Sequence, residues 1–429
     1  MRITILTAGS RGDVQPYIAL GKSLAEAGYT VTVAAHAPFE AFVEGHGLAF
    51  APMSGDPKAM LEGEKGRAWL ETNGNPIQFV RGAIELARPE LRAMLADCIQ
   101  ATEDAEAILY PTLLAFAGTS IGEARGIPAI PAYLQHVHPT RHYPPPFAQQ
   151  VSAFGGRMKQ FTYRAGYALF WRLIRDDVNA WRRSALGLPS LPNGAPITQW
   201  MQKAPLCLYG FSRHVLPAPN DWPANAHVTG YWFLDAPEWT PPPALADFLD
   251  GGPPPVYIGF GSMTNRDPEA VATTVVEALR RTGERGLLLT GWGGIADLNL
   301  PDSVFVIDGA PHHQLFPRMK AVVHHGGAGT TAAGLRAGRP SVLVPFFGDQ
   351  PFWGWRVNAL GVGPEPVRRK QLSADRLAHA IRHAATDSGI TTRAAQLGRQ
   401  IEAEHEAKAW LPLIEQAVTR ASRGASSGR

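Results

Sequence analysis

The stretch of sequence that decides the fold is AVVHHGGAGTTAAGLR, residues 321–336. It begins with an apolar run typical of a buried strand, continues as a glycine-rich turn, and ends in residues compatible with a helix. Small residues at such a turn let backbone N–H groups approach an anion, and the helix N-terminus adds a favourable partial charge. The pattern predicts a phosphate-binding turn in an α/β fold. The alternative is a tight strand-to-helix connection that binds no ligand.

The residues around this turn continue the alternation of strands and helices. Strands are predicted over residues 256–260, 286–290, 304–307, 321–324 and 341–345. The first of them ends in a second glycine turn, GFGSM, residues 259–263. We expect the hydroxyl of Ser262 to donate to a phosphate oxygen there; the alternative is a turn that only ends the strand.

The first half of the chain has the same character. Strands are predicted over residues 2–8, 30–35, 107–110 and 129–133. The loop GSRGDVQP, residues 9–16, follows the first strand, and we expect its helix to start near Pro16, because proline suits a first helical turn. Asp13 stands where a general base would be placed at a strand end. An aspartate before a helix is equally typical of a helix cap.

The domain organisation follows from length and from proline. A chain of 429 residues exceeds what one hydrophobic core usually organises. We predict an N-terminal domain over 1–215, a proline-rich linker over 216–252 and a second domain over 253–390, with helices over 391–421 and a disordered tail over 422–429. Two such sheets predict a ligand cleft at the carboxyl ends of their strands.

Composition excludes several classes of protein. Forty basic and 37 acidic residues are spread along the chain without a block of like charge, so nucleic acid is not an expected partner. Two cysteines without a C-x-x-C pairing predict a reduced, cytoplasmic protein. The first residues lack the pattern of a signal peptide, and no apolar run approaches the ~18 residues of a spanning helix. We expect a globular enzyme or binding protein.

A rival interpretation of the glycine turn is a nicotinamide-binding oxidoreductase. Gly327-x-Gly329-x-x-Ala332 matches the dinucleotide fingerprint, and Asp349 lies about 20 residues further on. However, Asp349 is followed by a glutamine in FFGDQP, and the fingerprint usually opens the first domain of such an enzyme. The sequence has neither a P-loop motif nor a D-x-D pair, which gives a metal-bridged nucleotide site no support.

Together these segments resemble the inverting UDP-glycosyltransferases, most closely the sterol 3β-glucosyltransferase-like branch, with antibiotic glycosyltransferases nearby. The resemblance rests on GSRGDVQPYIALG from residue 9, PPPVYIGFGSM from residue 253 and HHGGAGTTAAGLRAGRPSVLVPFFGDQPFWG from residue 324. It implies the GT-B fold, in which two Rossmann-like domains face each other across a cleft. It also implies that the helices over 391–421 pack back on the N-terminal domain.

The resemblance assigns roles residue by residue. Asp13 matches the general base, and Asp349 with Gln350 matches the pair that holds hydroxyls of the donor sugar. Contacts to the nucleotide and its diphosphate are implied for Ser10, Arg11, Ser262, Trp292, Ala310, His324, Gly327, Ala328, Gly329 and Thr330. The implied reaction transfers a hexose from a UDP-sugar, used as a co-substrate, to a lipophilic hydroxylated acceptor, with no cofactor and no metal. A non-catalytic nucleotide-sugar binder is the third alternative.

The acceptor side is less defined. His138 is an alternative base or a helper beside the acceptor, although a loop histidine bonded within the protein fits the sequence as well; Phe352 and Trp353 are further acceptor-side candidates. The segment PHHQLF, residues 311–316, departs from the pattern of the sterol enzymes toward that of the antibiotic enzymes. Aromatic and basic residues interleave over 161–183, which predicts an acceptor wall, a peripheral membrane contact or a partly buried helix.

Overall fold

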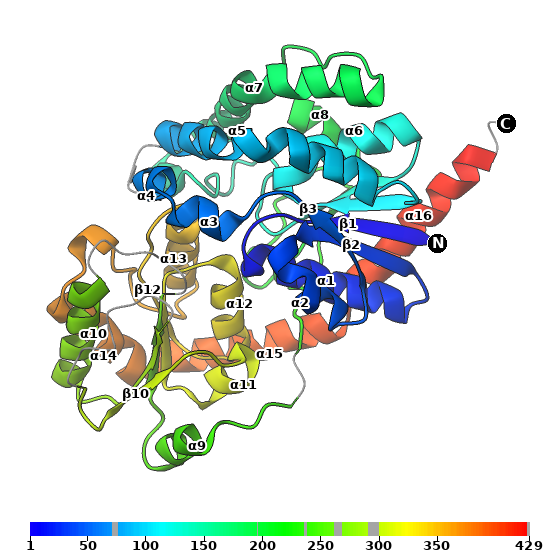
Figure 1. Ribbon diagram of the computed structural model, residues 1–429. Helices are drawn as coiled ribbons and strands as arrows, with labels where there is room; N and C mark the ends of the chain where they lie inside the picture. Colours follow the sequence, from blue (N-terminus) through cyan, green and yellow to red (C-terminus); the bar gives the residue numbers. More distant parts are fainter. Residues whose placement is uncertain (71–75, 195, 236–237, 261–267, 291–299, 427–429) are drawn as a thin grey trace. The chain divides into compact units, whose positions relative to one another are not determined.

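The computed structural model describes residues 1–70, 76–194, 196–235, 238–260, 268–290 and 300–426 (Figure 1). The chain forms two compact units. The first contains residues 1–234 and 404–429, and the second contains residues 235–403. Among the described residues, no helix combines the length and the apolar character that crossing a membrane requires.

The first unit is built on a parallel sheet with the strand order β3-β2-β1-β4-β5-β6-β7. Its strands are β1 (Arg2–Leu6), β2 (Thr30–His36), β3 (Ala49–Met53), β4 (Ala107–Tyr110), β5 (Ala129–Tyr133), β6 (Cys207–Tyr209) and β7 (Ala226–Val228). Strands β1 and β4 are almost entirely buried, as expected for central strands of a sheet covered on both faces. The predicted doubly wound α/β fold is confirmed for this unit.

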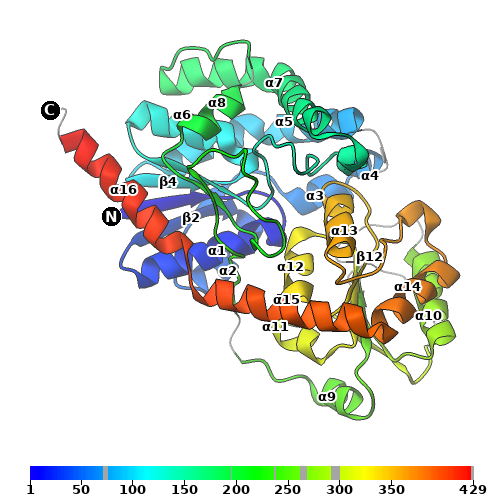
Figure 2. The same ribbon diagram turned by 180° about the vertical axis from the view of Figure 1, so that it is seen from behind.

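Helices cover this sheet and supply the rest of the core. They are α1 (Arg11–Glu26), α2 (Glu40–Glu44), α3 (Pro57–Glu62), α4 (Glu64–Leu70), α5 (Pro76–Ala101), α6 (Ala115–Arg125), α7 (Gly156–Leu186), α8 (Pro196–Lys203) and α16 (Trp410–Ser426). Helix α16 comes from the far end of the chain, yet Trp410, Ile414 and Val418 belong to the same apolar core as β1 and α1 (Figures 1 and 2). The C-terminal helix therefore completes the core of the N-terminal unit.

The second unit has a five-stranded parallel sheet with the order β10-β9-β8-β11-β12. Its strands are β8 (Val256–Gly259), β9 (Gly286–Leu289), β10 (Val304–Ile307), β11 (Ala321–His324) and β12 (Ser341–Leu343). Its helices are α9 (Pro243–Asp250), α10 (Pro268–Thr282), α11 (His312–Leu315), α12 (Ala328–Arg336), α13 (Gln350–Ala359), α14 (Ala374–Thr386) and the larger part of α15 (Ser388–Glu406). The strand order reverses between β8 and β11, which is the switch point where sheets of this kind bind ligands.

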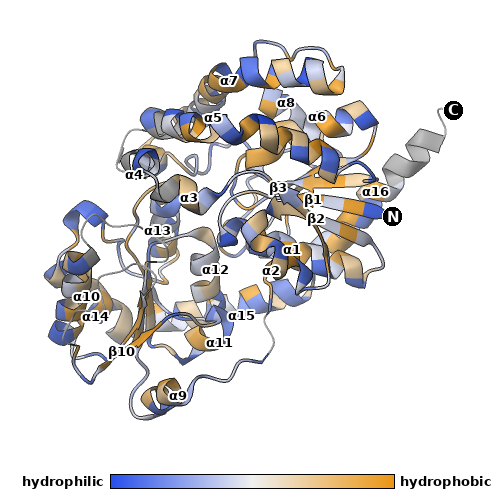
Figure 3. Cartoon of the chain, viewed as in Figure 1, coloured by the Kyte–Doolittle hydropathy of each residue, from blue (hydrophilic) through white to orange (hydrophobic). Residues whose placement is uncertain are grey.

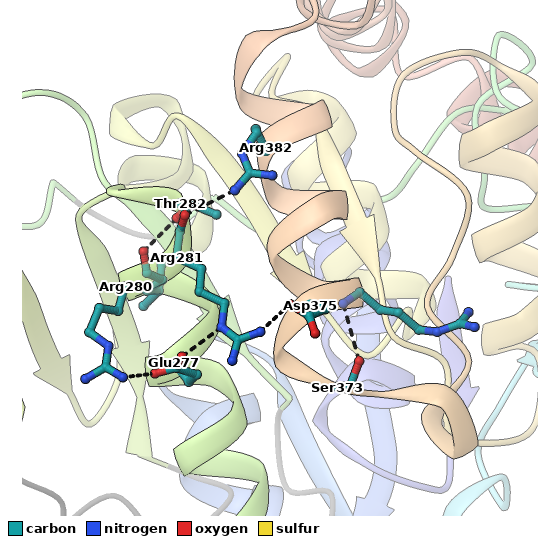
Figure 4. A network of polar contacts seen from close by, with 9 residues as sticks. Glu277, Arg280, Arg281, Thr282, Ser373, Asp375 and Arg382 are labelled. Atoms are coloured by element: carbon teal, nitrogen blue, oxygen red, sulfur yellow. Dashed lines mark hydrogen bonds and ion pairs between the residues drawn. The ribbon is translucent and has the colours of Figure 1, made fainter.

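Helices α10 and α14 lie side by side and are linked at the surface by charged side chains (Figure 4). Arg281 donates from Nε to Glu277 on its own helix at 2.7 Å and also pairs with Asp375 of α14. Such exposed pairs contribute little to stability. The apolar contacts beneath them, which include Leu279 and Ile381, account for most of the association of the two helices.

The observed boundaries differ from the predicted ones. Leu216 and Trp232 are buried within the first unit, so the chain leaves that unit after Leu234 and not at residue 215. The proline-rich stretch that was predicted as linker contains α9, because proline is well accommodated at a helix start. At the other end, α16 continues to Ser426, whereas the disordered tail was predicted from residue 422.

Helix α1 also starts earlier than predicted. The Ser10 carbonyl accepts hydrogen bonds from the N–H groups of Asp13 and Val14, so the helix begins at Arg11. Pro16 lies in the second turn, where the missing N–H removes one helical hydrogen bond. The earlier start places Asp13 inside the first turn of α1.

Candidate functional site

The candidate residues lie beyond the carboxyl ends of parallel strands in each unit. Asp13 follows β1 in the first unit, while His324 ends β11 and Asp349 follows β12 in the second. Because parallel strands end at the same edge of a sheet, segments far apart in the sequence are gathered at that edge.

Asp13 is held in one orientation by the turn that precedes α1. The backbone N–H and the hydroxyl of Ser10 both donate to Asp13 Oδ2, at 2.8 and 2.9 Å. The Thr7 hydroxyl donates to the Asp13 carbonyl at 2.8 Å. Within the described residues, both hydrogen bonds to the carboxylate end on Oδ2, so Oδ1 is the oxygen left to take up a proton.

Gly9 makes this arrangement possible. Its φ of +126° lies in a region that side chains disfavour, and a Cβ there would come within 2.5 Å of Asp13 Oδ2. A glycine is therefore needed both for the backbone conformation and for the space beside the carboxylate.

The environment of Asp13 makes its carboxylate more basic than that of a free aspartate. Burial raises the pKa of Asp13, and the hydrogen bonds from Ser10 together with the nearby His36 only partly oppose this. The cap that the sequence suggested is present, since Ser10 and Asp13 form a capping box. A carboxylate that is oriented and raised in pKa is equally suited to general-base chemistry.

Ser10 and Arg11 make contacts inside the first unit. The Ser10 hydroxyl is committed to Asp13. The Arg11 guanidinium lies 4.7 Å from the centre of the Phe42 ring, and its Nε donates to Gln15 at 3.2 Å. These contacts position Arg11 on the exposed side of the loop, and its assigned role toward phosphates stays a prediction.

The glycine turn of the second unit forms an open helix N-terminus. Gly327 is the N-cap of α12, and its carbonyl accepts from Thr331 N–H at 2.9 Å. The amides of Ala328, Gly329 and Thr330 precede the first intrahelical donor, as at every helix start. A Cβ on Gly329 would meet no atom within 4 Å, so the space above these amides is open. The turn has the geometry of an anion-binding site.

The two histidines before this turn have different surroundings. His324 is fully buried at the end of β11, and its Nδ1 accepts from Gly326 N–H at 3.0 Å, which leaves the proton on Nε2. His325 is half-buried, and its Nε2 would lie 2.5 Å from a Cβ on Gly327. Burial lowers the pKa of His325 to about 4 and that of His324 well below its usual value, so both rings are neutral near pH 7.

The contact predicted for His324 stays a prediction, because its buried Nε2 has no hydrogen-bond partner among the described residues, and the more exposed His325 is a second candidate. The sequence assigned the contact to His324, whose ring is closed off from solvent and holds the backbone of the turn. His325, which the sequence did not single out, lies against the first residues of the helix start. The pair of adjacent histidines was visible in the sequence. Only the structure shows that β11 ends at His324, which makes His324 more deeply buried than His325.

Asp349 and Gln350 open α13 beyond the end of β12. Trp353 Nε1 donates to Asp349 Oδ2 at 2.9 Å, and Gln350 Oε1 accepts from Phe346 N–H at 2.8 Å. Gly348, with φ of +66°, gives the chain the bend that brings the pair to the helix start. Both side chains are thus fixed by neighbours.

The remaining candidates are distributed as follows. Phe352 and Trp353 are buried in the second unit and stack edge to face, so the predicted direct contact with an acceptor does not fit their burial. Trp353 instead orients the Asp349 carboxylate. Ala310 is half-buried in the loop after β10. Ser262 and Trp292 lie outside the described residues.

His138 is a buried histidine of the first unit. Its Nδ1 faces the Tyr209 hydroxyl, and its ring packs against Trp222. Burial lowers its pKa to about 4. The ring also borders a cavity of about 270 Å³ whose other polar residues include Gln160 and Gln202. These contacts favour a structural role for His138, and its place in the cavity wall keeps a contact with a ligand as a prediction.

A metal site was not expected, and a search of the described residues finds no group of three or more His, Cys, Asp or Glu side chains arranged to hold an ion.

Comparison with known proteins identifies both halves of the chain. Residues 3–144 match the model of the glycosyltransferase family 28 N-terminal domain, and residues 294–409 match that of the erythromycin biosynthesis protein CIII-like C-terminal domain. A sterol 3-beta-glucosyltransferase of Emericella nidulans is 39% identical over 94% of this chain, which spans 29% of that protein's length. Sterol 3-beta-glucosyltransferase UGT80A2 of Arabidopsis thaliana is 40% identical over 89% of this chain, which spans 60% of its length.

Solved structures show the same fold over the whole chain. The calicheamicin glycosyltransferase CalG4 aligns with a TM-score of 0.69, covers 98% of each chain and is 19% identical. None of these relatives supports a nicotinamide-dependent oxidoreductase. The chain therefore has the fold of the glycosyltransferase CalG4, and it carries a match to a family 28 N-terminal domain in its first half and to an erythromycin CIII-like C-terminal domain in its second.

Proposed function

We propose that this chain transfers a hexose from a nucleoside diphosphate sugar to a hydroxyl group of a lipophilic acceptor, with inversion and with Asp13 as general base. The observation that carries the proposal is the Asp13 turn. A half-buried carboxylate with a raised pKa is fixed through Oδ2 and leaves Oδ1 as the proton acceptor. The similarity to sterol glucosyltransferases supports the reaction and the lipophilic class of acceptor.

In the proposed step, the acceptor hydroxyl oxygen forms a bond to the anomeric carbon while its proton passes to Asp13 Oδ1. The bond between the anomeric carbon and the diphosphate oxygen breaks, and the electron pair leaves with the nucleoside diphosphate. A single displacement inverts the configuration. Since even a raised aspartate is a weak base toward an alcohol, proton transfer is expected to be concerted with attack.

The second unit is proposed to stabilise the leaving diphosphate. The amides of Ala328, Gly329 and Thr330 and the partial positive charge of α12 supply fixed dipoles. We assign the neighbouring side-chain contact to His325. Because its ring is neutral, it contributes an N–H dipole and no formal charge.

Asp349 and Gln350 are proposed to bind hydroxyls of the donor sugar. Their hydrogen bonds to Trp353 and to the loop backbone support this role, because pre-oriented side chains lose little entropy when a ligand binds. Ser10, Arg11, Ser262, Trp292 and Ala310 remain proposed nucleotide contacts by resemblance. We also propose that the transfer needs no metal ion.

The direct experiment is a transfer assay with UDP-glucose and a panel of sterols, macrolides and phenols, followed by analysis of the anomeric configuration. The proposal predicts a β-glucoside and one equivalent of UDP. The same assay with a thymidine diphosphate sugar identifies the preferred nucleobase of the donor. A protein that binds UDP without releasing it from any donor would support the non-catalytic alternative, and a product with retained configuration would contradict the mechanism.

A further inference from the structure

The start of helix α7 exposes large apolar side chains. Phe154 just before the helix is 55% exposed, Met158 in its first turn is 49% exposed and Phe161 in its second turn is 63% exposed. Scattered single apolar residues on a surface are ordinary, but three large ones within eight residues form a patch.

Helical spacing places Met158 and Phe161 on one face of α7, while Phe154 lies just before the helix. Met158, Phe161 and Ala165 follow the i, i+3, i+7 spacing of a single stripe. The opposite face is buried and contains Tyr163 and Trp171. Hydrophilic and hydrophobic bands accordingly alternate along α7 in Figure 3.

This division decides among the three interpretations of residues 161–183 for part of the helix. The partly buried helix fits Tyr163, Trp171 and Trp181, because all three are buried. Trp171 stacks on Phe116 at 5.3 Å and therefore holds α7 against the first unit. The apolar surface available to a partner lies N-terminal to these residues.

The charge around the stripe has one sign. Residues 140–175 contain no acidic residue and six basic ones, namely Arg141, Arg157, Lys159, Arg164, Arg172 and Arg175. Arg157 and Arg164 directly precede Met158 and Ala165, so they flank the stripe on one side of the helix. Lys159 directly follows Met158 and flanks it on the other side. Among the described residues, none of these three has a carboxylate within ion-pair distance. The first acidic residue after this stretch is Asp176, whose side chain is 91% exposed.

We propose that this α7 surface, comprising Phe154, Arg157, Met158, Lys159, Phe161 and Arg164, docks the protein on an anionic lipid bilayer. In this arrangement α7 lies parallel to the membrane, the apolar side chains enter the boundary between headgroups and acyl chains, and the basic side chains contact lipid phosphates. Aromatic anchors beside basic side chains that form no ion pair among the described residues are the combination that favours an anionic bilayer.

The docking inference rests on the proposed function only in explaining what docking is for. A lipophilic acceptor concentrates in membranes, so docking would bring the N-terminal unit to the phase that holds the acceptor. Binding to lipid can be measured without turnover, which makes failure of docking distinguishable from failure of the proposed function.

The test is co-sedimentation of the full chain with phosphatidylcholine vesicles prepared with and without phosphatidylglycerol. We expect sedimentation with the anionic vesicles. Phe154→Ser and Phe161→Ser should each weaken binding by on the order of tenfold. Arg157→Ser and Arg164→Ser should each weaken it by about fivefold on anionic vesicles only, with a loss that added salt reproduces.

Two control variants separate the surface from general effects on folding or charge. Phe161→Leu keeps an apolar side chain at the position and should retain binding, and Arg280→Ser removes an exposed positive charge from α10 and should bind like the wild type. Wild-type protein that stays in the supernatant would overturn the proposal, as would serine variants that sediment as well as the wild type. Transfer to a water-soluble acceptor, assayed in parallel, should be unchanged in Phe154→Ser and Arg157→Ser. If the wild type shows no such transfer but still sediments, the proposed function fails and the docking inference stands.

Discussion

Among single residues, the proposed mechanism depends most on Asp13, because a short turn orients its carboxylate and burial raises its pKa. The Ser10 donors fix Oδ2, Gly9 leaves room for it, and burial raises the pKa of Asp13. The same hydrogen bonds form the cap of α1. The cap is observed and the proposed role as base uses the same hydrogen bonds, so the two interpretations that the sequence left open are compatible.

The Ser10 hydroxyl should control the acid limb of the pH profile. The base must be ionised, so kcat/KM falls as pH decreases through the raised pKa of Asp13. Ser10→Ala removes a donor that stabilises the ionised form, which raises this pKa further and moves the acid limb to higher pH by about one unit. Ser10→Thr, which keeps the hydroxyl, is the control. An unchanged limb in Ser10→Ala would mean that another group titrates.

Sequence motifs could select some candidate site residues but could not show how deeply each of them is buried. Asp13, Asp349 and Gln350 could be selected because their motifs are specific. His324 and His325 could not be separated, because adjacent side chains point in opposite directions from a strand and the end of β11 decides which one is buried. Phe352 and Trp353 were selected without knowledge of the second unit's core, in which they are packed.

At the scale of elements, α12 is the clearest test of the diphosphate assignment. A Cβ on Gly329 would occupy open space, so substitutions there should leave the fold intact. Gly329→Asp places a negative charge among the amides proposed to bind phosphate and should weaken UDP binding by at least about tenfold. Gly329→Ala should change it by less than about threefold. Isothermal titration calorimetry with UDP gives both values, and equal affinities would argue against this site.

Helix α16 makes a separate prediction about stability. Ile414 is fully buried in the core of the first unit, so Ile414→Ala should lower the free energy of unfolding by about 2–5 kcal/mol. Gln416 on the exposed side of the same helix is the matched control, and its replacement by alanine should have little effect. Urea unfolding followed by tryptophan fluorescence measures the difference. A loss no larger than that of the control would mean that α16 is not part of this core.

Most elements were predictable because strands β4, β5, β10 and β11 are short apolar runs flanked by turn residues. The start of α1 was not, because Pro16 was interpreted as a first-turn proline while Ser10 supplied the cap. The return of α16 to the first unit was implied only by family resemblance. No local pattern could indicate it, since the other residues of this core lie at least about 180 residues earlier in the sequence.

At the scale of the whole molecule, the chain divides the proposed reaction between two sheets of the same type. The proposed base lies in the first unit, and the groups proposed to bind a diphosphate and a sugar lie in the second. Because these groups are backbone amides, neutral imidazoles and fixed side chains, we expect transfer to proceed without a divalent ion. Activity measured after dialysis against EDTA should equal that of the untreated protein. Loss of activity that Mg²⁺ or Mn²⁺ restores would contradict this expectation.

Removal of the acceptor proton by Asp13 is the step on which the proposed mechanism depends, and the Asp13→Asn variant isolates that step. Asparagine keeps the size of the side chain and cannot act as the base. If Asp13 is the base, kcat for glucosyl transfer should fall by at least about a hundredfold in this variant. The dissociation constant for UDP, measured by calorimetry, should stay at the wild-type value. An Asp13→Asn protein that transfers glucose at the wild-type rate would contradict the role of Asp13 as base.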